Sequence, residues 1–179
     1  MSSQTNAIRT IEDRLRAVED QLEILNLIAS HPPSADTGAD YYTRVAYVED
    51  GELYLGRGKA TTGNETIAAV TRTPAHQAAI AGGLAHFAGL PRIELDGDRA
   101  VVTSYLQILT PHPTAAPHEV PNHGVSNGFR IHRVAVNRWE LVRTAAGWKI
   151  KRRTVRTVDG SEPPRELLRG ALKTFEPKN

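Results

Sequence analysis

The second half of the chain alternates in a way that restricts its fold more than any other feature. Between residues 99 and 110, odd and even positions form two faces without charged residues beyond the first position. Alternation also runs through residues 128–143 and, after a turn at Gly147, through 148–158. A shorter strand, residues 92–96, is joined to strand 99–110 by the turn Asp96-Gly97-Asp98. A period of two with short turns predicts long antiparallel strands.

Strand 99–110 also bears on assembly. Both of its faces are apolar or neutral, a composition typical of a strand that is covered on both sides. A single layer of helices covers one face only. We therefore expect a homo-oligomer, a dimer or a trimer, in which a second copy packs against the outer face.

Residues 6–30 predict one long helix before the sheet. Apolar side chains recur at spacings of three and four: Ile8, Ile11, Leu15, Val18, Leu22 and Leu25. Thr10 and Asp13 have the spacing of a capping box, which places the start of the helix between residues 4 and 10. The pattern fits a coiled-coil dimer element or an amphipathic helix on a sheet, and we favour the second for so short a segment. The more apolar C-terminal half is expected to be the more buried, and Pro32-Pro33 ends the helix.

Shorter elements complete an α+β pattern. We expect a helix at 40–45, a turn at Glu49-Asp50-Gly51, a strand at 52–55, a hairpin at 56–59, a helix at 65–80 that Pro74 interrupts, and a last helix at 164–173. Helices grouped on one side of an antiparallel sheet define the α+β class. At 179 residues and 40% hydrophobic composition, we expect one domain spanning residues 1–179.

Composition excludes several functions. With 22 basic and 20 acidic residues, the net charge of +2 predicts no nucleic-acid partner. Without cysteine the chain has no disulfide, thiolate metal site or thiol nucleophile. The polar N-terminus and the absence of a long apolar run predict no signal peptide and no membrane partner, and hence a cytoplasmic location. The basic string Lys149, Lys151, Arg152, Arg153 has no interleaved aromatic residues, so we interpret it as a solvated strand face.

The segment 111–127 has the composition of a loop. It contains four prolines and three histidines, His112, His118 and His123. Their spacing of six and five matches no metal-ligand motif that we can defend, so we expect no metal. Long proline-rich loops are often lids, and we expect this one to be mobile beside a pocket.

Two titratable residues lie where chemistry is expected. His86 stands among apolar neighbours, after the helical segment that ends at Ala81-Gly82-Gly83 and before strand 92–96. Asp36 follows the apolar end of the first helical region. The alternatives are a packing role for His86 and an N-cap role for Asp36 at the helix 40–45.

In order and spacing these features resemble a SnoaL-like protein of the nuclear transport factor 2-like superfamily. The resemblance covers about residues 10–160. It depends on the helix followed by Asp36, the 49–51 segment before a strand, His86 before a strand and a Gly-Asp turn, and Asn137–Arg143 before Gly147–Ile150. It implies a cone-shaped curved antiparallel sheet wrapped round N-terminal helices, a cystatin-like roll with a pocket inside.

The resemblance also implies a chemistry. The superfamily includes polyketide cyclases, scytalone dehydratase, bile-acid dehydratase, a dehydrochlorinase, a steroid isomerase and an epoxide hydrolase, and also members that do no chemistry. Several of the lyases pair an Asp with a His at the positions of Asp36 and His86. The dehydratase and dehydrochlorinase patterns carry a polar or basic residue five positions before the Asp, which is His31 here, although Pro32-Pro33 departs from them.

The physical case for such a dyad is simple. Neutral imidazole can remove a carbon-bound proton at neutral pH, and an Asp on its other nitrogen sets the tautomer. A second polar group would stabilise the developing charge. We assign catalysis to Asp36, His86 and His31, and substrate contacts to Tyr42, His76, Tyr105, Asn137, Trp139 and Arg156. We expect a lyase or isomerase without cofactor acting on a small hydrophobic or aromatic ring compound; the alternatives are a non-catalytic binding or assembly module and a cyclase-like or epoxide-hydrolase-like enzyme.

Overall fold

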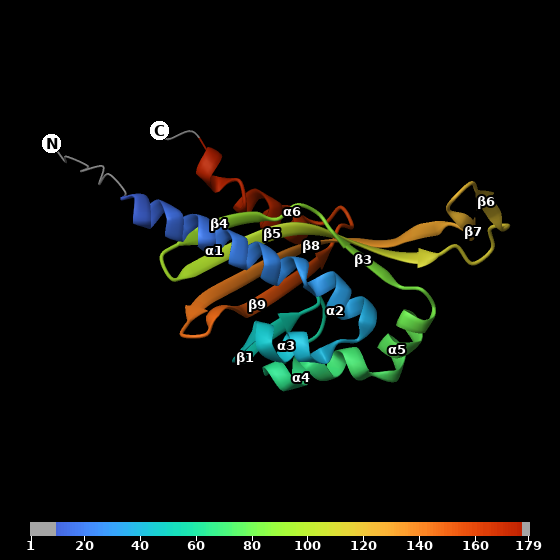
Figure 1. Ribbon diagram of the computed structural model, residues 1–179, viewed down its shortest axis with the longest axis horizontal. Helices are drawn as coiled ribbons and strands as arrows, with labels where there is room; N and C mark the ends of the chain where they lie inside the picture. Colours follow the sequence, from blue (N-terminus) through green and yellow to red (C-terminus); the bar gives the residue numbers. More distant parts are fainter. Residues whose placement is uncertain (1–9, 177–179) are drawn as a thin grey trace.

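The computed structural model describes residues 10–176 and confirms the α+β class (Figure 1). The helices are α1 (Ile11–Ala29), α2 (His31–Thr37), α3 (Asp40–Ala46), α4 (Asn64–Ala69), α5 (Pro74–Ala81) and α6 (Glu162–Gly170), with 3-10 turns η1 (Val70–Arg72) and η2 (Lys173–Phe175). The strands are β1 (Tyr47–Tyr54), β2 (Thr61–Thr62), β3 (Ala85–Ala88), β4 (Arg92–Asp96), β5 (Arg99–Pro111), β6 (His118–Val120), β7 (Gly124–Ser126), β8 (Phe129–Thr144) and β9 (Gly147–Thr157).

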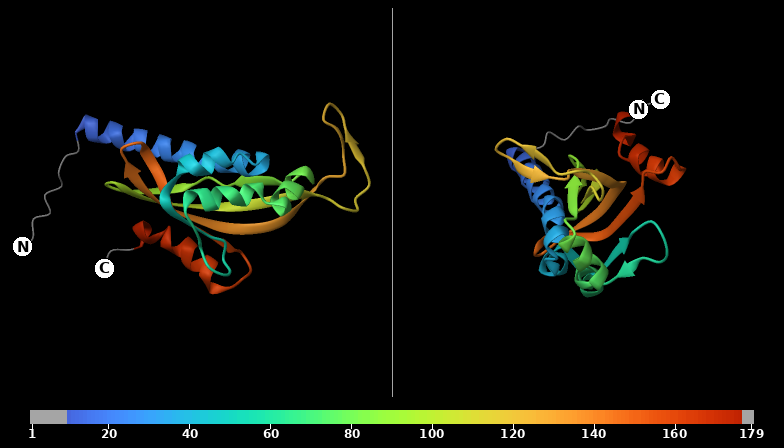
Figure 2. Two further views of the ribbon diagram at one scale, coloured as in Figure 1. Left: turned by 90° about the horizontal axis from the view of Figure 1, so that it is seen from below. Right: turned by 90° about the vertical axis from the view of Figure 1, so that its right-hand side faces the viewer.

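One curved sheet organises these elements. Its strand order is β2-β1-β9-β8-β5-β3, and β4 also pairs with β5. All pairs are antiparallel except β1 with β9, which is parallel. The expected strands 92–96, 99–110 and 128–143 are confirmed within two residues at each end, and the hairpin at 56–59 joins β1 to β2. The helices α1 and α2 cover one face, and α6 lies on the opposite side (Figure 2).

The orientation of α1 differs from expectation. Thr10 is its N-cap and forms the predicted capping box with Asp13, and Ile24 and Ile28 in the C-terminal half are buried. However, the expected inner face is exposed, with exposed fractions from 38% at Leu25 to 77% at Ile11. Ile8 lies outside the described residues.

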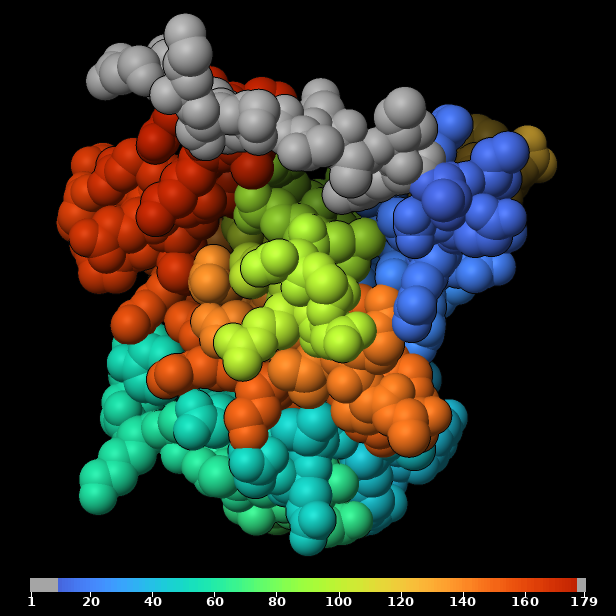
Figure 3. Space-filling model, turned by 90° about the vertical axis from the view of Figure 1, so that its left-hand side faces the viewer, coloured from blue at the N-terminus to red at the C-terminus, as the bar shows by residue number. Residues whose placement is uncertain are grey.

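A charged network explains which face of α1 turns inward. Asp20 is buried and accepts hydrogen bonds from Arg143 of β8, at 2.7 Å from Nη1, and from the Trp148 indole of β9, at 3.1 Å. Arg143 holds the pKa of Asp20 below its ordinary value. This network lies where α1 meets the β4–β5 and β8–β9 turns, the end of the molecule seen in Figure 3. The polar side of α1 that carries Asp20 therefore faces the sheet, because Arg143 and Trp148 bind this carboxylate there.

β-Bulges interrupt the sheet near its centre. In β8, Arg133 pairs with Ile108 and Ile131 with Leu109, so His132 is an extra residue. In β9, Arg152 pairs with Glu140 and Ile150 with Leu141, so Lys151 is extra. A bulge shifts the alternation of a strand and often re-aims a side chain beside a site. Inward-facing positions in β9 accordingly change from Trp148 and Ile150 to Arg153 and Val155.

Two further expectations need correction. Glu49-Asp50-Gly51 is not a turn but lies within an irregular part of β1. The segment 111–127 forms an exposed hairpin, β6–β7, that projects from the ends of β5 and β8 and lines neither cavity described below, so the lid prediction is wrong (Figure 1). In the single chain, strand β5 is fully covered along its even-numbered face as far as Leu106. Tyr105 on the other face, where a second copy is expected to pack, is 48% exposed.

The hydrophobic core lies between the helical layer and the sheet. It joins Ile24 and Ile28 of α1 with Trp139, Trp148 and other buried side chains of the strands. A second, smaller cluster forms round Leu106, Ala135 and Val155. Between residues 10 and 176 no helix is both long and apolar enough to cross a membrane.

Candidate active site

A cavity of about 190 Å³ opens between the helices and the inner face of the sheet. Residues of α2, α3, α4, η1 and α5 form one wall, and β1, β3, β5, β8 and β9 form the other. Much of the lining is apolar, including Leu53, Ile67, Leu106 and Val155. Polar side chains share this lining, among them three histidines and two arginines, a mixture found in small-molecule sites.

Asp36 and His86 are brought together at this cavity. His86 lies on β3 and lines the cavity, and Asp36 lies in the last turn of α2 behind it. Asp36 Oδ1 is 2.5 Å from His86 Nδ1, and Oδ2 accepts the His86 backbone N–H at 2.9 Å. Asp36 is not an N-cap, because it stands inside α2 and Ala39 precedes α3.

This geometry fixes the state of His86. The carboxylate accepts at Nδ1, so the proton of the neutral ring is on Nδ1 and Nε2 carries a free lone pair. Burial lowers the pKa of His86 and outweighs the opposing effect of Asp36, which raises it. The ring is thus neutral near pH 7 and suited to accept a proton.

His31 also faces the cavity, at the start of α2. Pro32 and Pro33 do not displace it, because they occupy the first turn of α2, where a missing backbone N–H is tolerated. Its ring lies edge-on to His86, with ring centres 6.0 Å apart. Burial, together with the charge of Arg153, lowers its pKa well below the ordinary value.

Arg153 is the functional residue that the sequence interpretation missed. It is only 6% exposed, and it lines the cavity instead of forming a solvated face. Its Nε donates to Asn137 Oδ1 at 3.1 Å, its Nη1 to His31 Nδ1 at 3.3 Å, and the guanidinium lies 4.2 Å from the centre of the Trp139 ring. Because guanidinium can only donate, His31 must carry its proton on Nε2 when neutral.

Two expected substrate contacts lie elsewhere. Tyr42 donates its hydroxyl to the Leu27 carbonyl at 2.7 Å and packs on the core, so it holds α3 against α1. Its burial raises its pKa. Tyr105 points outward from β5, on the face opposite the cavity. Both assignments are wrong for this cavity, because neither residue lines it.

The remaining assignments are partly met. His76 lines the cavity, and its Nε2 donates to the Ala35 carbonyl at 2.8 Å. Asn137 and Trp139 are buried beneath Arg153 and support it instead of lining the cavity themselves. Arg156 lies in a neighbouring, outer cavity, where it bonds to the Tyr54 hydroxyl and the Gly56 carbonyl.

Comparison with known proteins supports the architecture. A sequence profile of the SnoaL-like domain matches residues 16–154. A solved structure from Novosphingobium aromaticivorans, described as an NTF2-like protein with a cystatin-like fold, is 34% identical with a TM-score of 0.77; the match covers 90% of this chain and 99% of that one. A search of functionally curated proteins returns no match.

More distant structures share the fold alone. Aln2 from a Streptomyces species is 18% identical with a TM-score of 0.63, covering 79% of this chain and 92% of its own. A candidate scytalone dehydratase from Novosphingobium aromaticivorans is 17% identical with a TM-score of 0.58, covering 83% and 89% of the two chains.

Proposed function

The chain belongs to the SnoaL-like domain family, and from this premise we propose that it is a lyase that eliminates a small leaving group from a small hydrophobic or aromatic ring compound. The observation that carries the proposal is the Asp36–His86 pair at the wall of a largely apolar cavity. The same pair could serve the related isomerisation, since both reactions begin with removal of a carbon-bound proton.

The proposed step assigns one role to each side chain. His86 Nε2 removes the proton from carbon, the C–H electron pair becomes the new double bond, and the leaving group departs with its bonding electrons. Asp36 keeps His86 in the required tautomer and stabilises the imidazolium that forms. Side-chain acid–base chemistry is sufficient for this step.

His31 and Arg153 are proposed to stabilise developing negative charge. Arg153 fixes the proton of His31 on Nε2, so neutral His31 can donate a hydrogen bond from Nε2 to a carbonyl or leaving-group oxygen. The guanidinium adds positive charge in a partly water-excluded site, where electrostatic stabilisation is strongest. Asn137 and Trp139 are positioning residues, because they act through Arg153.

The test begins with the small molecule that copurifies with the protein, identified by mass spectrometry. In parallel, a panel of ring compounds with a hydroxyl group β to a carbonyl is screened for the ultraviolet absorbance of a conjugated product. We expect His86→Ala to lower turnover by about 10²–10⁴-fold, the usual contribution of a general base.

A matched control separates chemistry from folding. His118→Ala removes an exposed histidine of the β6–β7 hairpin and should leave turnover unchanged. Circular dichroism should show that both variants fold. Turnover by His86→Ala at the rate of the wild type would contradict the proposal. Binding of the copurified compound without any reaction would also contradict it and favour a binding module.

A further inference from the structure

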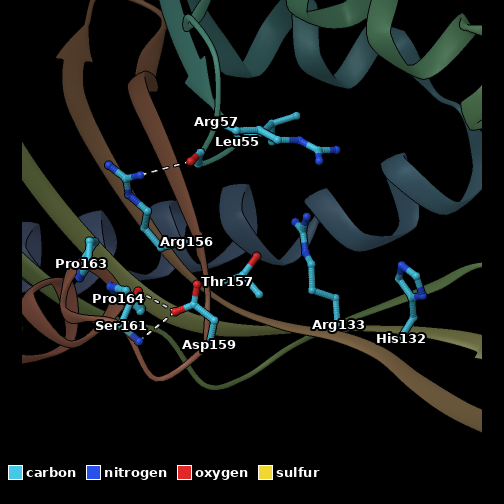
Figure 4. A pocket seen from close by; sticks show the side chains of 11 residues that line it. Leu55, Arg57, His132, Arg133, Arg156, Thr157, Asp159, Ser161, Pro163 and Pro164 are labelled. Carbon is cyan, nitrogen blue, oxygen red and sulfur yellow. Dashed lines mark hydrogen bonds between the residues drawn. The ribbon is translucent and has the colours of Figure 1, made fainter.

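Arginine side chains gather round the cavity that His31 and His86 line, which we call the inner cavity, and round a second cavity next to it. Arg133 of β8 and Arg153 of β9 line the inner cavity. A second cavity of about 500 Å³ is lined by Arg57, Arg133 and Arg156. Leu55 and Arg133 line both, so the two cavities adjoin at Arg133. Figure 4 shows Arg133 extending from β8 toward the loop that carries Leu55 and Arg57.

These charges have no acidic partner among residues 10–176. Ion pairs elsewhere engage other arginines and lysines, but none includes Arg57, Arg133, Arg153 or Arg156. Beside the inner cavity, Asp36 directs both oxygens to His86. In the outer cavity, Asp159 accepts hydrogen bonds from the Ser161 backbone and hydroxyl (Figure 4).

Arg133 is the least satisfied of the group. Its Nε is buried and has no hydrogen-bond partner in the described part of the chain. Burial, together with the charge of Arg57, lowers its pKa, and the charge of Arg133 in turn contributes to lowering the pKa of Arg153. Arginine nevertheless stays protonated in proteins. The fold therefore holds several like charges together, which is unfavourable unless an anion joins them.

The partners of Arg153 are neutral, so they orient its charge without cancelling it. They are Asn137, His31 and the face of Trp139. Arg133 stands at the bulge of β8, and both it and the extra residue, His132, line the outer cavity. A bulge at a cavity edge is a feature that folds keep where a side chain must be aimed. This arrangement is complementary to a group with negative charge.

We propose that the substrate carries an anionic group, a carboxylate or a phosphate, which binds Arg133 at the junction of the two cavities while its ring faces His86. The proposal rests on the proposed function for the position of the ring. Guanidinium matches both anions through paired N–H donors. Arg57 and Arg156 add positive potential along the outer cavity, which favours entry of an anion.

The experiment compares three probes of one ring size: 2-naphthoate, 2-naphthyl phosphate and neutral 2-naphthamide. Affinities are measured by isothermal titration calorimetry. We expect the wild type to bind at least one anion about tenfold or more tightly than the amide. Arg133→Gln should weaken binding of that anion by about 10- to 100-fold, as for loss of a charged hydrogen bond, and leave the amide unchanged.

Arg138→Gln is the matched control. Arg138 lies on the same strand but pairs with Glu140, away from both cavities, so this variant should keep the preference for anions. Equal binding of anion and amide by the wild type, no binding of either anion at millimolar concentration, or a preference that survives Arg133→Gln would overturn the proposal. The comparison of anion and amide binding by the wild type tests the proposal even if a variant fails to fold.

The outcome can be separated from that of the proposed function. His86→Ala should lower turnover by about 10²–10⁴-fold and keep anion binding, because His86 is not the anion ligand. Preferential binding of an anion without any turnover would refute the proposed lyase activity but support the proposal that the ligand is an anion. Turnover of neutral ring compounds that depends on His86, without preferential binding of anions, would refute the anionic ligand but support the lyase activity.

Discussion

Asp36 holds His86 through two contacts, one to the ring and one to the backbone. The second contact ties the carboxylate to the strand itself, so the orientation of the pair does not depend on ring rotation alone. Asp36 comes from α2 and His86 from β3, and these two elements lie against each other at this corner of the fold. At the residue scale, the His86 imidazole is thus held in one position before any ligand binds.

The pH dependence of activity should report this pair. Burial lowers the pKa of His86 and Asp36 raises it, with burial the larger effect. A base must be unprotonated, so kcat/KM should be constant near neutral pH and fall as pH drops through a pKa below the ordinary 6.5. In Asp36→Asn the raising effect is lost, so the acid limb should move to lower pH while kcat falls.

The measurement is a pH–rate profile of both proteins on one substrate. Glu19→Gln, an exposed change on α1, is the control and should leave the profile in place. An acid limb that stays unmoved in Asp36→Asn would show that a group other than His86 controls activity.

At the scale of elements, α1 is attached by one polar residue as much as by its apolar ones. Asp20 joins Arg143 and Trp148, residues of the two central strands, while the regular apolar stripe of α1 remains exposed. A buried carboxylate in this position stabilises only while its partners are in place.

We therefore predict that Asp20→Asn lowers the free energy of unfolding by about 1–3 kcal/mol, the usual effect of losing hydrogen bonds to a charged group. Urea unfolding at neutral pH measures this. Since Arg143 lowers the pKa of Asp20, the stabilisation is present above the unfolded-state value of 3.8 and is lost as pH falls through the lower folded-state value. Leu22→Gln, on the exposed stripe, should cost much less, and a larger loss there would contradict this account.

At the scale of the whole molecule, the outer face of the sheet carries an apolar patch. It consists of Phe87, Tyr105, Phe129 and Ile131, which are exposed and which the strand register places on the same side. Exposed apolar side chains on one face of a sheet often mark a subunit interface. The chain covers part of this face with its own α6, which packs on β8 and β9 (Figure 2). The four side chains of the patch stay exposed.

A homo-oligomer, most simply a dimer with two-fold symmetry, stays our prediction. Light scattering at micromolar concentration should show a dimer, and Tyr105→Glu should shift it toward the monomer because it places a charge within the patch. Leu90→Glu, in the exposed loop after β3, is the control and should remain dimeric. A monomeric wild type would refute the prediction.

The sequence by itself determined the long strands, most helices and the two candidates for the dyad, but not α2 or β3, the short elements that carry them. Strand periods, the Thr10–Asp13 capping box and the Pro74 interruption depend on interactions between residues close in the chain, so local patterns predict them. The resemblance of Asp36 and His86 to a family pattern indicated the pair before any geometry was known. Their contact, across a separation of 50 residues, is the part of the site that was predicted.

Only the tertiary structure decided which faces turn inward. Unbroken alternation from Trp148 and Ile150 would have placed Arg152 inside, but the extra residue Lys151 turns Arg153 to the cavity instead. The apolar stripe of α1 gave no sign that Asp20 would find Arg143, 123 positions away. Burial is a property of partners distant in sequence, and a single-residue bulge reverses every side chain beyond it, which is why neither outcome can be predicted from local periodicity.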